Sequence, residues 1–134
     1  MSTPHKPHGP GFLALTADAK KLVKELSIGQ YKEQYLTGAE PEHLLVDVRE
    51  DREWAEGHAK GAIHLSRGII ERDIETTVPD KNTKIVCYCG GGYRSALVAE
   101  SLGKMGYTDV WSLNGGWREW TAAGLPAELP PEKK

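Results

Sequence analysis

The sequence predicts one α/β domain with a central, mainly parallel sheet flanked by helices. Short apolar or β-branched segments alternate with segments whose apolar residues have helical spacing, as in sheets covered on both faces. The chain has 134 residues, enough for one well-packed core and too few for two. We expect residues 1–15 to form a mobile N-terminal arm, 16–126 the domain and 127–134 a C-terminal tail.

The first helix is expected from Thr16, whose hydroxyl suits an N-cap, and helical periodicity extends it to Leu26. A second short helix is expected at 30–36, before Gly38. Apolar, β-branched or aromatic runs predict the strands, at 44–48, 61–64, 83–88 and 110–113. Helical spacing followed by a glycine or a turn predicts the later helices, at 51–56, 95–105 and 116–123.

The charge balance argues against partners that bind through a strong electrostatic field. The chain carries 17 basic and 19 acidic residues, for a net charge of −2, so we expect no nucleic-acid or membrane partner. No apolar run approaches the roughly 18 residues that span a bilayer. The apolar stretch at 12–15 is too short for a secretory signal, and we expect a cytoplasmic protein.

The two cysteines, Cys87 and Cys89, are separated by one residue in an expected strand. A disulfide between them would be strained, and two cysteines are too few for a structural zinc site unless histidines contribute. We expect no metal. Cys87 has apolar neighbours and is best interpreted as a buried core thiol.

Cys89 begins a loop that joins a buried strand to a helix, where ligands bind in open α/β sheets. Gly90, Gly91 and Gly92 allow positive φ, so that several N–H groups turn inward and bind an anion together with the helix N-terminus. Arg94 offers a planar fork of donors. In this field Cys89 is expected to be held largely as its thiolate, which makes it a nucleophile.

Other interpretations of this loop are weaker. The stretch has neither the spaced glycines of a dinucleotide site nor the Gly-Lys-Ser/Thr of a P-loop. A glycine-rich junction with a buried cysteine and no chemistry remains an alternative.

Three blocks of the sequence together resemble the rhodanese family of sulfurtransferases, in its single-domain form. They are LVDVRE at 45–50 with EW at 53–54 and GHAKGAIH at 57–64, CGGGYRS at 89–95, and LNGGWREW at 113–120 with AGLP at 123–126. The order and spacing match the family from Leu44 to Pro126. One departure is Ala59-Lys60, where Ile-Pro is usual, outside the loop.

The resemblance implies a rhodanese-like fold, with a strand at 24–28 that shortens the first helix. It implies that Cys89 carries a persulfide and that no cofactor is needed. The donor would be a small sulfur-containing anion such as thiosulfate, or a persulfide, and the thiophilic acceptor a thiol or a protein. The anion site would consist of the loop, that is Gly90, Gly91, Gly92, Tyr93 and Arg94, supported by Asp47, Arg49 and Ser95.

Two other functions stay open on this fold. Related phosphatases have one more residue between the cysteine and the arginine than the four present here, so sulfur transfer is favoured over a phosphatase or an arsenate reductase. A regulatory or sulfur-relay module without turnover is the other alternative.

Outside the loop, structural roles are favoured over chemistry. For Asp47 and Arg49 a scaffold role is preferred to direct catalysis, and for His58 packing is preferred to a role as a base. His64, Arg67 and Glu71 are candidates for the pocket wall or mouth. The tryptophans are expected in the core or as a buttress of the loop, at Trp111, Trp117 and Trp120.

Overall fold

The computed structural model describes residues 8–37 and 42–130. At its centre is a parallel sheet with the strand order β1-β6-β5-β2-β4. The strands are β1 (Lys24–Leu26), β2 (Leu44–Asp47), β4 (Ile63–His64), β5 (Ile85–Tyr88) and β6 (Val110–Leu113). Because β5 is the middle strand, the loop that follows it leaves from the centre of the sheet.

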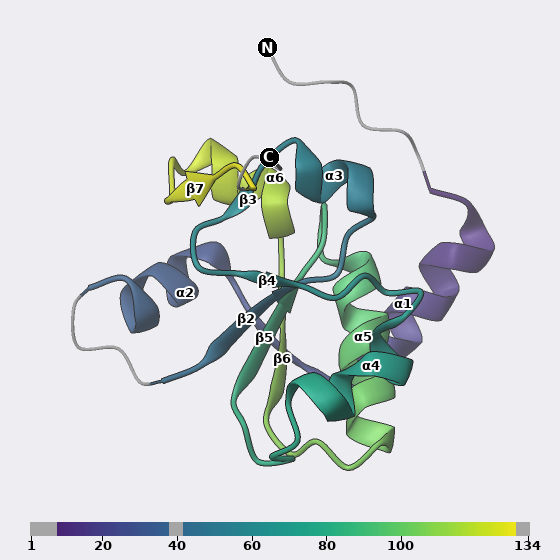
Figure 1. Ribbon diagram of the computed structural model, residues 1–134. Coiled ribbons are helices and arrows are strands. Elements are labelled where there is room, and N and C mark those ends of the chain that lie inside the picture. Colours follow the sequence, from purple (N-terminus) through teal and green to yellow (C-terminus); the bar gives the residue numbers. More distant parts are fainter. Residues whose placement is uncertain (1–7, 38–41, 131–134) are drawn as a thin grey trace.

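Helices cover both faces of this sheet (Figure 1). On one side lie α1 (Pro10–Leu22), α4 (Ile70–Thr77) and α5 (Tyr93–Lys104), and on the other α2 (Ile28–Tyr35) and α6 (Gly116–Ala122). The short α3 (Asp51–Ala55) lies beyond the carboxyl ends of the strands. The expected fold class, an α/β domain with a mainly parallel sheet flanked by helices, is confirmed.

The central strand shows why its sequence is apolar throughout. Ile85 and Cys87 face the cluster that includes α4 and α5, whereas Val86 and Tyr88 face the cluster that includes α2 and α6. Alternate side chains of a strand point to opposite faces, so a strand covered on both sides needs apolar residues at every position. All four residues have an exposed fraction of 0%.

The first helix starts earlier than expected. It begins at Pro10, a residue suited to the first helical turn, so residues 10–15 are helical rather than part of an arm. Thr16 is not an N-cap: it is buried inside the helix, and its hydroxyl donates to the carbonyl of Leu13 at 3.1 Å. The helix ends at Leu22, and β1 replaces the extension to Leu26. Residues 1–7, the rest of the expected mobile arm, lie outside the described residues.

Four further details differ from expectation. Residues of the expected tail form β7 (Ala127–Glu128), which pairs antiparallel with β3 (His58–Ala59), a strand that was not expected. Residues 131–134 lie outside the described part. Helix α4 was not expected either, and α5 begins two residues before Ser95.

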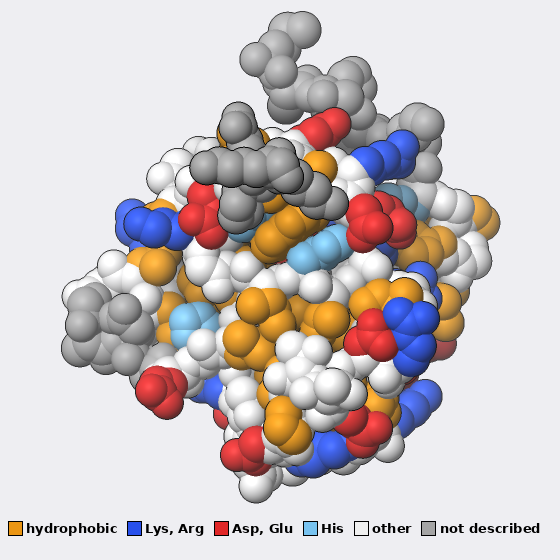
Figure 2. Space-filling view, in the orientation of Figure 1, with side chains coloured by type: hydrophobic (Ala, Val, Ile, Leu, Met, Phe, Trp, Pro, Cys, Tyr) orange, Lys and Arg blue, Asp and Glu red, His pale blue; other side chains and the backbone are white. Residues whose placement is uncertain are grey.

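The surface fits the balanced composition. Acidic and basic side chains are interspersed over the face in Figure 2, and neither sign dominates it. Of the helices in the described ranges, none combines the length and the apolar character needed to cross a bilayer.

Candidate active site

Cys89 directly follows β5 and is 1% exposed. Its Sγ accepts hydrogen bonds from the backbone N–H of Gly92, at 3.2 Å, and of Ser95, at 3.4 Å. Both donors belong to the N-terminal end of α5, whose dipole places partial positive charge there. The sulfur is therefore surrounded by groups that stabilise negative charge.

A pair of buried hydroxyls lies beside the same sulfur. Ser95 Oγ is 3.6 Å from Cys89 Sγ and 2.7 Å from Ser112 Oγ on β6. Ser112 can donate to Ser95, which leaves the Ser95 hydroxyl free to donate to a thiolate. Sequence reasoning included Ser95 but missed Ser112. The available signal was a serine within the otherwise apolar strand segment at 110–113. In the structure the exposed fraction of Ser112 is 0%.

The backbone of the loop is held by the start of α6. The N–H of Trp117 donates to the carbonyl of Cys89 at 2.7 Å, and the N–H of Arg118 donates to that of Gly90 at 3.0 Å. These bonds engage the loop carbonyls, whereas the N–H groups of Gly90 and Gly91 meet no acceptor among residues 8–37 and 42–130. Those amides remain available to an incoming anion.

Two glycines are required for this contact between loop and helix. Gly116 has φ +49°, and a Cβ there would lie 2.3 Å from the carbonyl oxygen of Cys89. Gly92 has φ +95°, and its Cβ would lie 3.2 Å from the nitrogen of Gly115. The expectation of positive φ was wrong for Gly90 and Gly91, which lie outside that region. Because they lack a Cβ they leave room beside the loop, but their backbone conformation is one that other residues also adopt.

Arg94 forms a bidentate ion pair with Glu53 of α3, at 2.8 and 3.1 Å. Glu53 belongs to the EW motif at 53–54, but the sequence did not single it out as the partner of Arg94. Burial alone would raise the pKa of Glu53, but hydrogen bonds from Arg94 and from the Glu50 amide lower this pKa below its ordinary value. Arg94 therefore reaches over the loop and anchors it to α3.

Asp47 and Arg49 form a second, fully buried pair. The guanidinium of Arg49 contacts both oxygens of Asp47, with the shortest distance 2.8 Å, and the Tyr88 hydroxyl donates to Asp47 at 2.7 Å. Burial, and then the charge of Asp47, raises the pKa of Tyr88, so the phenol stays a neutral donor. Arg49 also lies 4.7 Å from the ring centroid of Trp117, whose N–H holds the Cys89 carbonyl.

A scaffold role and a catalytic role for Asp47 and Arg49 would require different contacts. The pair of Asp47 and Arg49 contacts Trp117 and Tyr88 rather than Cys89, which fits support of the loop. Tyr88 is a member of this network that sequence reasoning missed.

Cys87 is separated from this chemistry although it lies two residues away. Its exposed fraction is 0%, and burial, with the charge of Cys89 as a smaller cause, raises its pKa to about 12. Both cysteines are free. Cys87 is a core thiol in the neutral form.

Comparison with known proteins points to one family. The family model for the Rhodanese-like domain matches residues 29–123. This chain belongs to the rhodanese-like family. It is 36% identical over 104 residues to a Bacillus subtilis (strain 168) protein described as "Putative sulfurtransferase YtwF", covering 78% of this chain and 96% of that protein.

Two solved structures are also similar to this rhodanese-like domain. One, from Rhodopseudomonas palustris, is described as a protein of unknown function and "Possible Tyrosine Phosphatase"; it is 29% identical, with TM-score 0.80, and 95% of this chain and 100% of that chain are covered. The other is the polysulfide-sulfur transferase homodimer of Wolinella succinogenes, 27% identical with TM-score 0.72, covering 91% of this chain and 90% of that chain.

Helix α1 lies outside the matched region of the rhodanese-like domain and packs against the loop. The ring of Tyr93 contacts those of His8 and Phe12, with centroids 4.7 and 6.0 Å away, and Lys20 Nζ lies 5.1 Å from the Tyr93 centroid. Tyr93 therefore joins the loop to the N-terminal helix, a contact that the sequence did not reveal.

Two histidines of the rhodanese-like domain, His58 and His64, pack on one tryptophan. The Trp54 ring stacks on those of His58 and His64, with centroids 3.4 and 4.9 Å away. His64 Nε2 also lies 2.8 Å from the Arg49 carbonyl oxygen. Trp120 is 1% exposed, and its indole N–H donates to the Pro126 carbonyl at 2.9 Å. These contacts fit packing roles.

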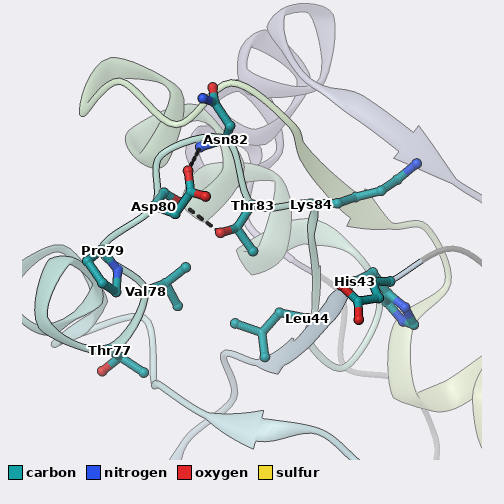
Figure 3. A pocket seen from close by; sticks show the side chains of 10 residues that line it. His43, Leu44, Thr77, Val78, Pro79, Asp80, Asn82, Thr83 and Lys84 are labelled. Carbon is teal, nitrogen blue, oxygen red and sulfur yellow. Dashed lines mark hydrogen bonds between the residues drawn. The ribbon is translucent and has the colours of Figure 1, made fainter.

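The remaining candidates make no hydrogen bond to Cys89 Sγ within the described residues. Arg67 and Glu71 are exposed, and no hydrogen bond or ion pair joins their side chains to the loop in the part of the chain that the structure describes. Trp111 lies on β6, and its indole N–H donates to the carboxylate of Asp109 at 2.8 Å. A separate cleft opens at the amino-terminal ends of β2 and β5, where Leu44 and Lys84 line it (Figure 3). It lies at the opposite end of β5 from Cys89.

Proposed function

We propose that this chain is a thiosulfate sulfurtransferase-type enzyme that carries sulfane sulfur as a persulfide on Cys89. The donor is thiosulfate or a persulfide, and the acceptor is a thiol, free or in a protein. The observation that carries this proposal is the pair of N–H groups, from Gly92 and Ser95, that point at Cys89 Sγ. Two free cysteines fit a reducing compartment such as the cytoplasm.

The reaction has two balanced halves. The Cys89 thiolate attacks the outer sulfur of thiosulfate; the S–S bond of thiosulfate breaks, sulfite leaves with the bonding electrons, and Cys89–S–S⁻ remains. A thiolate acceptor then attacks the terminal sulfur, which restores the Cys89 thiolate and yields the acceptor persulfide. No net oxidation occurs.

The loop supplies electrostatic stabilisation for both halves. We assign the terminal sulfur of the persulfide to the N–H groups of Gly90 and Gly91, which have no acceptor among residues 8–37 and 42–130. One such preorganised donor is worth about 2.7–4 kcal/mol in known oxyanion sites. A cradle of several therefore favours negative charge on the transferred sulfur.

Mass spectrometry tests the proposal directly. After incubation with a sulfur donor, the peptide that contains Cys87 and Cys89 should gain one sulfur atom, which a reductant removes. Fragmentation should place that sulfur on Cys89. A protein that no donor loads would contradict the proposed function and leave a module without turnover as the better interpretation.

A phosphatase is the second candidate, because one similar structure is described as a possible tyrosine phosphatase. Four residues separate Cys89 and Arg94, a shorter loop than related phosphatases have. Hydrolysis of an aryl phosphate faster than sulfur transfer would favour this candidate. Insertion of one glycine between Gly91 and Gly92 should widen the loop, lower sulfur transfer and favour phosphate hydrolysis.

A further inference from the structure

Ser112 is a buried serine of β6 that reaches the candidate site through Ser95. Its exposed fraction is 0%, and its hydroxyl lies 2.7 Å from that of Ser95. Ser95 is also 0% exposed, and its hydroxyl lies 3.6 Å from Cys89 Sγ. Within residues 8–37 and 42–130 the Ser112 hydroxyl has no second hydrogen-bond partner. Ser112 and Ser95, the hydroxyl pair, therefore form a buried row of two hydrogen bonds that ends at the sulfur.

The number of hydrogens in this row depends on the charge of Cys89. With a neutral thiol, the sulfur and the two hydroxyls carry three hydrogens for two hydrogen bonds, so one hydrogen has no acceptor in the row. With a thiolate, the two hydroxyl hydrogens fill both hydrogen bonds: Ser112 donates to Ser95, and Ser95 donates to Sγ. An unpaired buried hydroxyl costs free energy, and a hydroxyl that itself accepts a hydrogen bond is the stronger donor. The hydroxyl pair therefore favours negative charge on Sγ.

The sheet places Ser112 beside the sulfur but apart from the charged groups of the site. Ser112 lies opposite Cys87 in the parallel register of β5 and β6, on the face of the sheet that α5 covers. No hydrogen bond joins the side chains of these two residues in the described part of the chain. Arg94 and Cys87 interact electrostatically with Cys89. A substitution of Ser112 removes neither of them, so its effect on the sulfur passes through Ser95.

We propose that Ser112 is a positioning residue for sulfur delivery, because it holds the Ser95 hydroxyl on Cys89 Sγ and so makes Cys89 a better leaving group. This inference rests on the proposed function. In delivery the acceptor thiolate attacks the terminal sulfur of the persulfide, the S–S bond breaks, and its electron pair moves to Sγ. Negative charge grows on the atom to which the hydroxyl pair donates. Stabilised thiolates leave faster, so the hydroxyl pair accelerates delivery.

The hydroxyl pair should not accelerate loading. In loading the Cys89 thiolate attacks the donor, and negative charge leaves Sγ. Hydrogen bonds to a thiolate lower its nucleophilicity, although they raise the fraction that is ionised. On the high-pH plateau, where Cys89 is fully ionised, only the first effect remains. Loss of the hydroxyl pair should therefore slow delivery and leave loading unchanged or slightly faster. General damage to the fold would slow both steps.

Single-turnover rates of Ser112→Ala test this split. Loading by thiosulfate is followed by mass spectrometry of the quenched protein; delivery is followed as loss of the added sulfur after thiosulfate is removed and 2-mercaptoethanol is added. We expect delivery to slow about three- to tenfold, part of the effect of one hydrogen bond to a charged group. Loading on the high-pH plateau should slow by less than about twofold. The control is Thr16→Val, which removes a buried hydroxyl from α1 and should change neither rate.

A second pair of variants matches the packing. Ser112→Thr and Ser112→Val introduce side chains of the same shape, both suited to a strand, and only threonine has a hydroxyl. Ser112→Thr should deliver sulfur about three- to tenfold faster than Ser112→Val, so this pair decides if Ser112→Ala does not fold. In a Ser95→Ala background, Ser112→Ala should not slow delivery further, because Ser112 acts through Ser95.

The pH profile of alkylation gives a readout independent of sulfur transfer. In Ser112→Ala the pH at which iodoacetamide modifies Cys89 at half its maximal rate should rise by about 0.5–1 unit, because the thiolate loses part of its stabilisation. Thr16→Val should keep the wild-type profile. An unchanged profile in Ser112→Ala would show that the Ser112 hydroxyl does not act on Sγ, and would overturn the inference.

The outcomes separate this inference from the proposed function. Equal slowing of loading and delivery in Ser112→Ala would show a purely structural role, and undiminished delivery would show no role. Either result, or equal delivery by Ser112→Thr and Ser112→Val, would overturn the inference while Cys89 loading still supports sulfur transfer. A wild-type protein that neither thiosulfate nor sodium tetrasulfide loads on Cys89 would overturn both.

Discussion

Cys87 and Cys89 lie two residues apart, pack into the same core cluster and are at most 1% exposed. They differ in what surrounds the sulfur. Cys87 is inside β5, where the backbone N–H groups are used by neighbouring strands and the pKa of the thiol is about 12. Cys89 is one residue past the strand, where two N–H groups donate to its sulfur. The two thiols are equally buried. They differ because Cys89 lies at the end of a strand and beside the N-terminus of a helix, whereas Cys87 lies inside the strand.

Serine substitutions at the two positions should give the largest contrast. Cys89→Ser should lower sulfur transfer by more than about a thousandfold, because no other group can hold the persulfide. Cys87→Ser should keep activity but lower the free energy of unfolding by about 1–3 kcal/mol, since it buries a hydroxyl in an apolar cluster. Steady-state rates and urea unfolding measure both effects. Equal loss of activity in the two variants would remove the distinction.

Alkylation of the folded protein should show the same contrast in the native thiols. We expect iodoacetamide to modify Cys89 at least about a hundredfold faster than Cys87 near pH 8, because a thiol with a pKa of about 12 is almost entirely protonated there. Peptide mass spectrometry after timed quenching gives both rates. Access does not explain the expected ratio, because both residues are buried to a similar degree. In urea the two rates should become similar.

Gly116→Ala tests whether α6 holds the loop in its active shape. A Cβ at Gly116 would lie 2.3 Å from the Cys89 carbonyl oxygen, so the loop or the helix must move. We expect sulfur transfer to fall by about ten- to a hundredfold, the range for loss of one preorganised donor or slightly less. The matched control is Gly124→Ala, since Gly124 also has positive φ, +68°, but its Cβ would meet no atom within 4 Å.

The two variants separate backbone strain from contact with the loop. Each should lose stability, by roughly 1–2 kcal/mol, because alanine is strained at positive φ. Only Gly116→Ala should lose activity beyond that expected from the unfolded fraction. If Gly124→Ala loses as much activity, backbone strain at either end of α6 is sufficient to explain the loss, and the direct contact has no special role.

The contrast between predicted and observed features has a physical basis. Strands β2, β4, β5 and β6 and the loop were predictable because their signals are local: apolar runs such as residues 44–48, and glycines beside Cys89. The contacts that complete the site join residues far apart in the chain. Glu53 meets Arg94, and Trp117 meets the Cys89 carbonyl, only because the sheet brings the carboxyl ends of β2, β5 and β6 together. No periodicity in the sequence contains that information.

The early start of α1 has a different cause. Pro10 suits the first turn of the helix, but the glycines on either side of it, Gly9 and Gly11, disfavour a helix in isolation. Tertiary packing overrides this preference, because Phe12 contacts the Ala96–Leu97 cluster and Tyr93. The motifs that carry the family resemblance begin at residue 44; the resemblance shortened the end of this helix, through the strand at 24–28, but gave no information on its start.

A second comparison, between the two arginines, gives the next prediction. Arg49 is paired in the core, whereas Arg94 is paired at the rim of the loop. Arg94→Lys keeps the charge but cannot contact both oxygens of Glu53 with a planar fork. We expect kcat to fall about tenfold and KM to change by less, because Arg94 chiefly organises the loop. Cys89 alkylation should slow in parallel. A raised KM with unchanged kcat and unchanged alkylation would instead make Arg94 a substrate clamp.

The smallest expected effect concerns the contribution of Glu53 to stability. The pKa of Glu53 is lowered in the folded protein by Arg94 and the Glu50 amide against the opposing effect of burial. Such a carboxyl stabilises the fold at pH values above its unfolded pKa, and the contribution is lost as the pH falls through the folded value. Because the pair is partly exposed, we expect Glu53→Gln to lower the free energy of unfolding by only about 0.5–1 kcal/mol at pH 7.

That difference should shrink as the pH falls below about 4.3, the ordinary pKa of glutamate, because Glu53 of the unfolded chain then takes up a proton first. It should vanish once the pH is below the lowered pKa of the folded state, where wild-type Glu53 is protonated and resembles glutamine. Urea unfolding of wild type and Glu53→Gln at several pH values measures it. Glu56→Gln, on the same helix but exposed, should show no comparable difference at any pH. A difference that persists unchanged into acid would mean that Glu53 acts through hydrogen bonds that glutamine cannot copy, rather than through its charge. Arg94 would then be held by the geometry of those hydrogen bonds rather than by charge.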